Sequence, residues 1–274
     1  MTPHNDPHDL DATTPAVTDE ALFALFSGPD DAQDQEVDVG LARIRERLLG
    51  IRAPVMIGGL ELREVLGEGG MGKVYCAYSP GLEREVAVKV IRVRGRDRAT
   101  RVRAQERLLA EARIMAKVAH ANVVTIHDVG TEGDQVYLVM ERIAGKSLRE
   151  WIKGDARGWP DVLRLFVGAG RGLAAVHRAG VVHSDVKPEN ILVKIDGVGF
   201  EAKVSDFGVA RLVRGEGGGE EGPLAAYAYG GTPFYEAPEV AEGRCDARSD
   251  VYSLAVTLFE ALCGGHPYAR SFED

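Results

Sequence analysis

Three oxygen-bearing side chains and a lysine lie close together in the middle of the sequence. Asp185, Lys187 and Asn190 belong to the run that starts at His183 (His-Ser-Asp-Val-Lys-Pro-Glu-Asn), and Asp206 begins an Asp-Phe-Gly run. Carboxylate and amide oxygens are the ligands that Mg²⁺ prefers, and a nearby lysine can neutralise a phosphoryl group during its transfer. This set therefore predicts metal-assisted phosphoryl chemistry.

A second candidate is a lysine inside an apolar strand. The run Val-Ala-Val-Lys ends at Lys89, and a buried ammonium group needs a carboxylate or a phosphate as its partner. Glu111, on the helix predicted next along the chain, is the natural partner. A solvent-facing lysine on an edge strand and a solvated helix glutamate are the plainer alternatives, and each is the commoner case when such a residue occurs singly.

A glycine-rich turn precedes that lysine. Gly67, Gly69 and Gly72 form a GxGxxGxV pattern with Val74. Glycine lets a backbone approach phosphates closely and offer its N–H groups without a Cβ in the way. The pattern also marks dinucleotide sites, but there it opens a helix, whereas residues 73–78 continue as a strand. On its own, an ordinary glycine-rich hairpin is the alternative.

Hydrophobic patterning indicates the elements that must position these residues. Period-two alternation favours strands, and a period of 3.6 favours helices. Strands are expected over residues 60–66, 73–78, 85–93, 123–129 and 135–140, with shorter ones over 191–194 and 202–204. Helices are expected over residues 100–118, 147–153, 161–179 and 249–262. The sequence predicts a mostly β half with one helix, followed by a mainly helical half.

Taken together, the motifs resemble the eukaryotic-like protein kinase family. Its pattern of a Gly-rich loop, VAIK, HRDxKPEN, DFG and APE occurs in family order over residues 57–274, with Ala237-Pro238-Glu239 as the last motif. The Gly-Gly-Met-Gly turn and the Gly230-Gly231-Thr232-Pro233 run are especially similar to bacterial serine/threonine kinases. The resemblance implies an α+β, two-lobed protein-kinase fold with ATP in the cleft. Its small antiparallel β lobe with one helix would span 57–140, and its mainly helical large lobe 141–274.

The resemblance also implies roles in the chemistry. Asp185 accepts or orients the proton of the substrate hydroxyl. Lys187 stabilises the charge on the γ-phosphoryl group. Asn190 and Asp206 hold Mg²⁺.

Nucleotide contacts follow from the resemblance in the same way. The backbone of residues 67–72 covers the phosphates, and Lys89, held by Glu111, binds the α and β phosphates. The adenine and hinge contacts would come from Val74, Ala87, Met140, Glu141, Ile143 and Leu192. An apolar column that couples the lobes would consist of Met115, Ile126, His183 and Phe207.

The implied activity is ATP- and Mg²⁺-dependent phosphorylation of serine or threonine in protein substrates. Lys187 within DxKPEN and Thr232 just before APE resemble the serine/threonine branch rather than the tyrosine branch. One alternative is an ATP-binding pseudokinase or scaffold, inactive because C-terminal helices are missing. The other is a small-molecule phosphotransferase of the same fold, which the joint presence of DFG and APE disfavours.

One departure from the family concerns regulation. Ser184 stands where most members carry an arginine that collects a phosphate on the activation loop. From Phe207 to Gly231 the only hydroxyl-bearing residues are Tyr227 and Tyr229. Both features predict phosphate transfer without activation-loop phosphorylation. The alternative is that the serine is a neutral change and that the loop is ordered in another way.

A second departure lies at the C-terminus. The helix predicted over residues 249–262 resembles the central helix of the large lobe, after which family members continue through three or more further helices. We therefore expect a large lobe that lacks its last helices, with exposed apolar surface and an unpaired Glu239, because its family partner is an arginine in those helices. The chain would be a fragment of a longer protein, compatible with a downstream membrane helix, or a shortened product.

Composition places the chain among folded proteins. Of its 274 residues, 45% are hydrophobic and 27% are charged. Cys76, Cys245 and Cys263 lie far apart without a CxxC pair, which argues against a zinc ribbon or a disulfide framework. No apolar run approaches the roughly 20 residues of a membrane helix, and the N-terminus has no signal pattern. We expect a cytoplasmic location and no membrane contact within this chain.

Charge is uneven along the sequence. The net charge is −9, and the first 42 residues hold ten acidic residues and no Lys or Arg, so the remainder is nearly neutral. This pattern predicts an acidic disordered leader over 1–36. An amphipathic helix over 37–49 and a linker would complete a segment over 37–56. The cationic cluster over 92–103 is interrupted by Asp97, so we expect no nucleic-acid partner.

Overall fold

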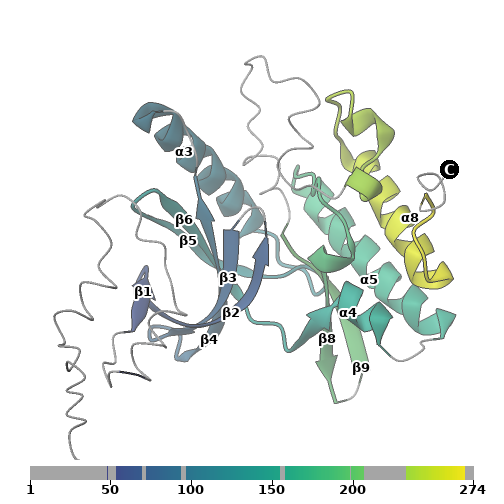
Figure 1. Cartoon of the computed structure of the whole chain (residues 1–274), viewed down its shortest axis with the longest axis horizontal. Coiled ribbons are helices and arrows are strands. Elements are labelled where there is room, and N and C mark those ends of the chain that lie inside the picture. Colours follow the sequence, from purple (N-terminus) through teal and green to yellow (C-terminus); the bar gives the residue numbers. More distant parts are fainter. Residues whose placement is uncertain are drawn as a thin grey trace, which may run out of the picture. The chain divides into compact units, whose positions relative to one another are not determined.

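Strand-forming residues dominate the first half of the fold, which is a six-stranded sheet in a computed structural model of the chain (Figure 1). The strands are β1 (Val55–Ile57), β2 (Leu60–Gly69), β3 (Gly72–Ser79), β4 (Arg84–Arg92), β5 (Ile126–Glu132) and β6 (Gln135–Glu141). Their order is β1-β2-β3-β4-β6-β5, and every neighbouring pair is antiparallel. The predicted antiparallel β lobe is confirmed.

The structure describes residues 48, 54–69, 72–93, 97–154, 158–197, 199–206 and 233–268. These residues belong to one compact unit, Val39–Asp274. The acidic leader over 1–36, the helix over 37–49 except its exposed helical residue Leu48, and the loop over 207–231 lie outside the described residues.

One helix, α3 (Arg98–Met115), packs on this sheet. Its N-terminus is capped by Asp97, whose side chain accepts a hydrogen bond from the Thr100 N–H at 2.7 Å. Leu108, Ala112 and Met115 form its buried face and lie near β5 and β6. The helix was predicted over 100–118, so its type was right and its bounds were shifted.

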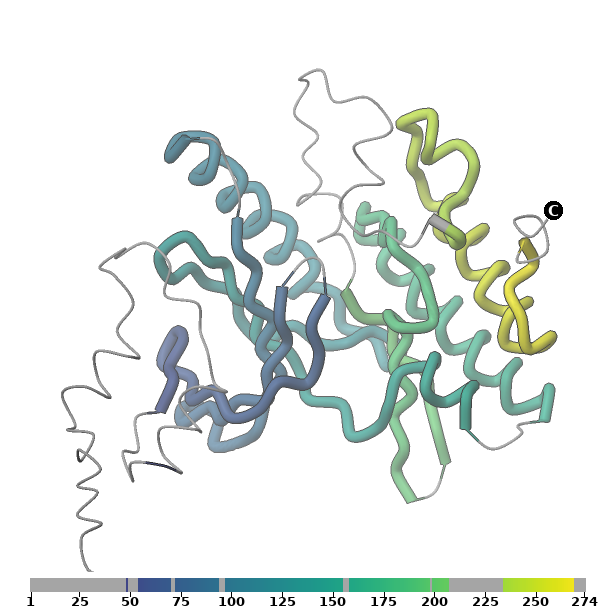
Figure 2. Tube along the Cα trace, viewed as in Figure 1, coloured from purple at the N-terminus to yellow at the C-terminus, as the bar shows by residue number. Residues whose placement is uncertain are grey.

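The second half is mainly helical. Its main helices are α4 (Leu148–Lys153), α5 (Trp159–Arg178) and α8 (Ala247–Cys263), and its short 3-10 turns are η1 (Pro188–Asn190), η2 (Pro233–Tyr235) and η3 (Pro238–Val240). A three-stranded sheet joins them, with β7 (Gly145–Ser147), β8 (Ile191–Asp196) and β9 (Gly199–Val204) in that order. Figure 2 shows α5 and α8 side by side. Among the described helices, none is both long and apolar enough to cross a membrane.

The prediction of a strand from residue 123 was wrong at its start. The backbone of residues 122–124 pairs with the end of β9 instead of β6: Val124 N–H donates to Val204 O, and Val204 N–H donates to Asn122 O, both at 2.9 Å. The short strands β1 and β7 were not predicted, because three residues are too few to show a period.

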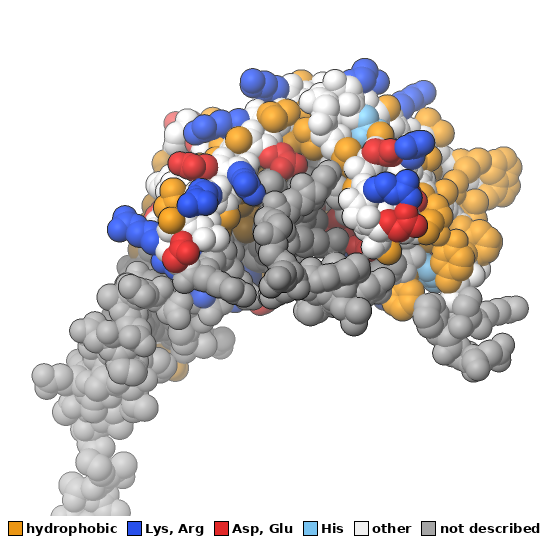
Figure 3. Space-filling model, turned by 90° about the horizontal axis from the view of Figure 1, so that it is seen from above, with side chains coloured by type: hydrophobic (Ala, Val, Ile, Leu, Met, Phe, Trp, Pro, Cys, Tyr) orange, Lys and Arg blue, Asp and Glu red, His pale blue; other side chains and the backbone are white. Residues whose placement is uncertain are grey.

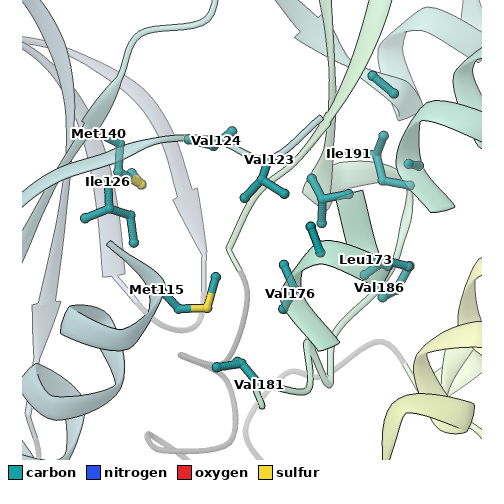
Figure 4. Close-up of a cluster of buried hydrophobic side chains, with 14 of the residues drawn as sticks. Met115, Val123, Val124, Ile126, Met140, Leu173, Val176, Val181, Val186 and Ile191 are labelled. Atoms are coloured by element: carbon teal, nitrogen blue, oxygen red, sulfur yellow. The ribbon is translucent and has the colours of Figure 1, made fainter. Parts of the chain in front are cut away.

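A continuous buried cluster links the two halves. Figure 4 shows Met115 of α3 and Ile126 of β5 in the same cluster as Val176 of α5 and Ile191 of β8, with Val123 between the sheets. Close packing of apolar side chains makes such a cluster rigid. It fixes the elements that carry the candidate site.

Candidate active site

The glycine-rich turn is the hairpin between β2 and β3, with Gly69 opposite Gly72. A Cβ on Gly67 or Gly69 would meet nothing within 4 Å, so their backbone borders open space. Gly72 differs: its φ is +139°, and a Cβ would lie 2.0 Å from the Val90 carbonyl oxygen. Its lack of a side chain is required by the close approach to β4.

Lys89 lies at the centre of β4 and is 5% exposed. Its ammonium group forms an ion pair with Asp206 at 2.9 Å. Burial would raise the pKa of the Asp206 carboxyl, but the neighbouring Lys89 outweighs it, and the pKa is held below its ordinary value. The carboxylate is therefore charged at neutral pH and is available to a cation.

The structure corrects the partner expected for Lys89. No ion pair joins Lys89 to Glu111 in the described part of the chain, and Asp206 takes that place. Glu111 is half-buried on α3 and makes another interaction. Two carboxylates compete for one ammonium group, and distance in the fold decides between them.

The run from His183 to Asn190 brings three predicted residues together. The Lys187 ammonium lies 2.9 Å from Asp185 Oδ2, and Asn190 Nδ2 donates to the Asp185 backbone oxygen at 2.8 Å and to Oδ2 at 2.9 Å. The Asp185 carboxylate is thus held by two donors. Among the described residues, nothing donates to the Asn190 amide oxygen.

A buried aspartate in α8, Asp250, holds this run from behind. It accepts hydrogen bonds from His183 N–H at 2.7 Å, Ser184 N–H at 2.8 Å and His177 Nε2 at 2.7 Å. Asp250 is 1% exposed. Sequence reasoning did not assign it a function, although a carboxylate inside an apolar helix was a usable signal, since buried charges are paired or hydrogen-bonded.

Two buried residues join the run to Asp206. His183 is fully buried, and burial lowers its pKa, so the ring is neutral. Its Nε2 donates to Ser205 O at 2.9 Å, and Ser205 Oγ donates to Asn190 O at 3.0 Å. Ser184 (φ +64°) and Asp206 (φ +61°) both have left-handed backbones. Such conformations persist only where the surroundings hold them, and they cluster at functional sites.

The residues expected around adenine lie on β3, β4 and β6, on the segment that follows β6, and on β8. Ala87 lies opposite Met140 across β4 and β6, and both are buried. Val74, Ile143 and Leu192 are partly buried and pack against the core. Five of the six therefore belong to, or pack against, one buried hydrophobic cluster.

Glu141, the sixth, uses its side chain elsewhere. Its carboxylate pairs with the buried Lys203 of β9 at 2.8 Å and accepts the Thr125 N–H at 2.7 Å. Burial raises its pKa, but the bonds from Lys203 and Thr125 lower it more, so it stays charged. Its backbone N–H is also engaged, because it donates to Thr125 O at 2.9 Å, so neither this group nor the side chain is available to a nucleotide.

The expected apolar column is partly described. Met115 and Ile126 share the buried cluster of Figure 4, and His183 is buried in the run already described. Phe207 lies outside the described residues.

Glu239, expected to lack its arginine partner, has a hydroxyl partner among the described residues. Its carboxylate accepts a hydrogen bond from Ser249 Oγ at 2.8 Å. The expected exposed apolar surface is present on α5 and α8, where Trp159, Val167, Val251 and Phe259 are all exposed. Hydrophobic side chains gather at the right of Figure 3, on the side of α8.

Comparison with known proteins gives one consistent result. The protein kinase domain family matches residues 60–274. The serine/threonine-protein kinase pkn2 of Myxococcus xanthus is 37% identical over 215 residues, covering 78% of this chain and 25% of that protein. A probable serine/threonine-protein kinase of Streptomyces coelicolor, SCO3848, is 39% identical over 222 residues, covering 78% and 32%. The chain spans about a quarter to a third of these relatives.

A solved structure has the same fold. The kinase domain of Mycobacterium tuberculosis PknI, crystallised as a double mutant, superposes with a TM-score of 0.61 at 23% identity. The match covers 80% of this chain and 81% of that one. The two-lobed fold predicted from the motifs is confirmed.

Proposed function

This chain belongs to the protein kinase domain family, and from that premise we propose that it transfers the γ-phosphate of ATP to serine or threonine hydroxyls of proteins. The observation that carries the proposal is a joint placement: the buried Lys89 pairs with Asp206, and the run that holds the Asp185 carboxylate is bonded through His183 to Ser205, the residue before Asp206. Named relatives are bacterial serine/threonine kinases, which supports the same activity. A cytoplasmic location belongs to this proposal.

The chain's own groups can orient the acceptor. Asp185 would take up or orient the hydroxyl proton, and its two donors, Lys187 and Asn190, keep the carboxylate in one position. From this position the Lys187 ammonium would also stabilise the charge on the γ-phosphoryl group. Phosphoryl transfer needs little covalent help from the protein, so positioning and charge supply most of the rate.

The oxygens present fit a magnesium ion. The Asn190 amide oxygen accepts no hydrogen bond from the described residues, and the Asp206 carboxylate stays charged. These two groups would hold Mg²⁺, which supplies charge neutralisation at the phosphates when bound. The backbone of Gly67 and Gly69, which borders open space, would cover the phosphates.

The Lys89 side requires a change of partner. To bind the α and β phosphates, the ammonium must leave Asp206, and Glu111 would then hold it in the arrangement that the family uses for transfer. An ATP-binding scaffold is the second candidate, since Lys89 and Asp206 neutralise each other in the described state. A scaffold would bind nucleotide but never make the exchange.

Transfer without activation-loop phosphorylation is part of the proposal. At the position of the usual arginine, Ser184 places an uncharged hydroxyl 3.4 Å from Cys245 Sγ. No guanidinium lies beside Asp185 there, so no phosphate is needed as its counter-charge. The backbone of Ser184 is held by Asp250 instead.

The test is transfer of labelled γ-phosphate from Mg·ATP to the chain itself and to a generic basic protein, before any pre-phosphorylation. Asp185→Asn is the control, because the amide keeps the shape and loses the base. We expect a loss of about 10²–10⁴-fold, with nucleotide affinity retained, and label on serine or threonine after acid hydrolysis. A folded chain that binds ATP and transfers no label would instead be the scaffold.

A further inference from the structure

Arg149 of α4 is the centre of a charged cluster outside the Asp185 run. Its Nε donates to Glu189 Oε1 at 2.7 Å, its Nη1 donates to Glu260 Oε1, and its Nη2 donates to the Tyr235 hydroxyl at 2.5 Å. The Tyr235 hydroxyl in turn donates to Glu260 Oε2 at 2.5 Å. One guanidinium therefore joins four elements: α4, η1, η2 and α8.

The charges of this cluster are fixed at neutral pH. Burial would lower the pKa of Arg149, but its hydrogen bonds to Glu189, Tyr235 and Glu260 raise it above the ordinary value. Burial and the hydrogen bond to Glu260 raise the pKa of Tyr235 to about 12. The cluster therefore holds two carboxylates, one guanidinium and a neutral hydroxyl.

The cluster borders the place where a peptide must lie. Glu189 directly precedes Asn190, whose amide holds Asp185, and Tyr235 lies just before Ala237 of the APE motif. We infer that the residues flanking an acceptor hydroxyl at Asp185 would lie along these two segments. Side chains of Glu189 and Arg149 are 46% and 23% exposed, so a peptide can reach them.

Two carboxylates that converge on one point are a site for a guanidinium, because planar donors match carboxylates with two parallel hydrogen bonds. Here the protein supplies that guanidinium itself. We propose that Arg149 determines substrate specificity by occupying the carboxylate pair of Glu189 and Glu260. A basic side chain of the peptide then gains no binding energy from these two carboxylates. The proposal rests on the proposed peptide phosphorylation.

The inference predicts a gain of selectivity when Arg149 is replaced. In Arg149→Met the two carboxylates lose their counter-charge, and an arginine of the peptide can replace it. In Arg149→Lys the charge stays, so the wild-type selectivity should return in large part. In Arg149→Met combined with Glu189→Gln, one carboxylate is neutral and the gain should shrink.

The experiment uses the full chain and a set of serine peptides. Each carries one arginine at a position from three residues before to three after the serine, and the parent peptide carries none. Wild type should show less than about twofold preference for any arginine peptide in kcat/KM, whereas Arg149→Met should prefer at least one of them by about tenfold. Arg171→Met, an exposed arginine of α5 without an ion pair in the described part of the chain, is the matched control and should behave as wild type.

Binding of the same peptides, labelled with a fluorophore, separates the two proposals because it needs no transfer. Tighter binding of the arginine peptide to Arg149→Met supports the specificity role even if no variant phosphorylates. A wild-type chain that already prefers arginine by tenfold overturns the role, whether or not the variants fold. If Arg149→Met lowers binding and kcat/KM equally for all peptides, without a change in selectivity, the specificity role is overturned as well. Arg149 would then have a structural role.

Discussion

The two sides of the candidate active site are held in different ways. On the Asp185 side, a run of backbone and side-chain groups is fixed by Asp250, His183 and Ser205, all of them buried. On the Lys89 side, a single ion pair to Asp206 holds the lysine, and Asp206 is 27% exposed. The acceptor side is therefore assembled in advance, whereas in the proposed function the nucleotide side would exchange partners. Buried networks resist change, and partly exposed ion pairs allow it.

Removing the support of the acceptor side should have the largest effect. Asp250→Ala leaves the N–H groups of His183 and Ser184 without their acceptor in a buried place. We expect a loss of about 3–5 kcal/mol in the free energy of unfolding, measured by urea denaturation, together with loss of transfer. Asp246→Ala, at the exposed N-cap of the same helix, should lose much less. Equal losses would contradict the special role of Asp250.

Removing the lysine tests the other side. Lys89→Met should lower kcat/KM about 10²-fold, because a charge directed at the phosphates is lost, but should change stability little. The pKa of Asp206 should rise, since Lys89 holds it down. Lys194→Met, on β8, is the control and should leave kcat/KM unchanged. A loss of stability as large as that of Asp250→Ala would show that both sides are equally structural.

Glu111 also distinguishes the two sides, because the proposed change of partner of Lys89 gives Glu111 a role in phosphate transfer. Glu111→Gln should lower the transfer rate about tenfold and should reduce the free energy of unfolding by much less than Asp250→Ala does. Glu106→Gln, an exposed glutamate of the same helix, should change neither. Transfer at the wild-type rate by Glu111→Gln would mean that Lys89 never takes this partner.

The smallest effect is the pH dependence of the Lys89 ion pair. The pKa of Asp206 is lower in the folded state than in the unfolded chain, so the pair stabilises the fold above about pH 4. This contribution is lost as pH falls through the folded pKa. Unfolding by urea at pH 5 and pH 3 should show a steeper loss for the wild type than for Asp206→Asn. Identical slopes would show that the pair adds no stability.

Motif residues could be predicted from the sequence because their types and spacing carry the chemistry. Asp185, Lys187 and Asn190 lie within six consecutive residues, so local spacing alone brings them together. Most strands and helices were predicted as well, since burial on one face leaves a period in the sequence.

Partners across long distances could not be predicted. Lys89 has two candidate carboxylates far along the chain, and Glu239 has the hydroxyl of Ser249, which no local pattern indicates. The start of β5 was misplaced for the same reason: the apolar residues Val123 and Val124 suit a strand, but their backbone partner is Val204 of the other sheet. Competition between possible partners is settled by tertiary distance.

That short backbone pairing has a mechanical consequence. The chain crosses between the two lobes after Glu141, and residues 122–124 attach to β9 at a second point through two backbone hydrogen bonds. Two fixed points define an axis, so a rotation about that line would leave both attachments intact, whereas sliding or twisting would break the pairing. Bending about this axis would change the distance between Lys89 and the phosphate side of the site while leaving the adenine side nearly still.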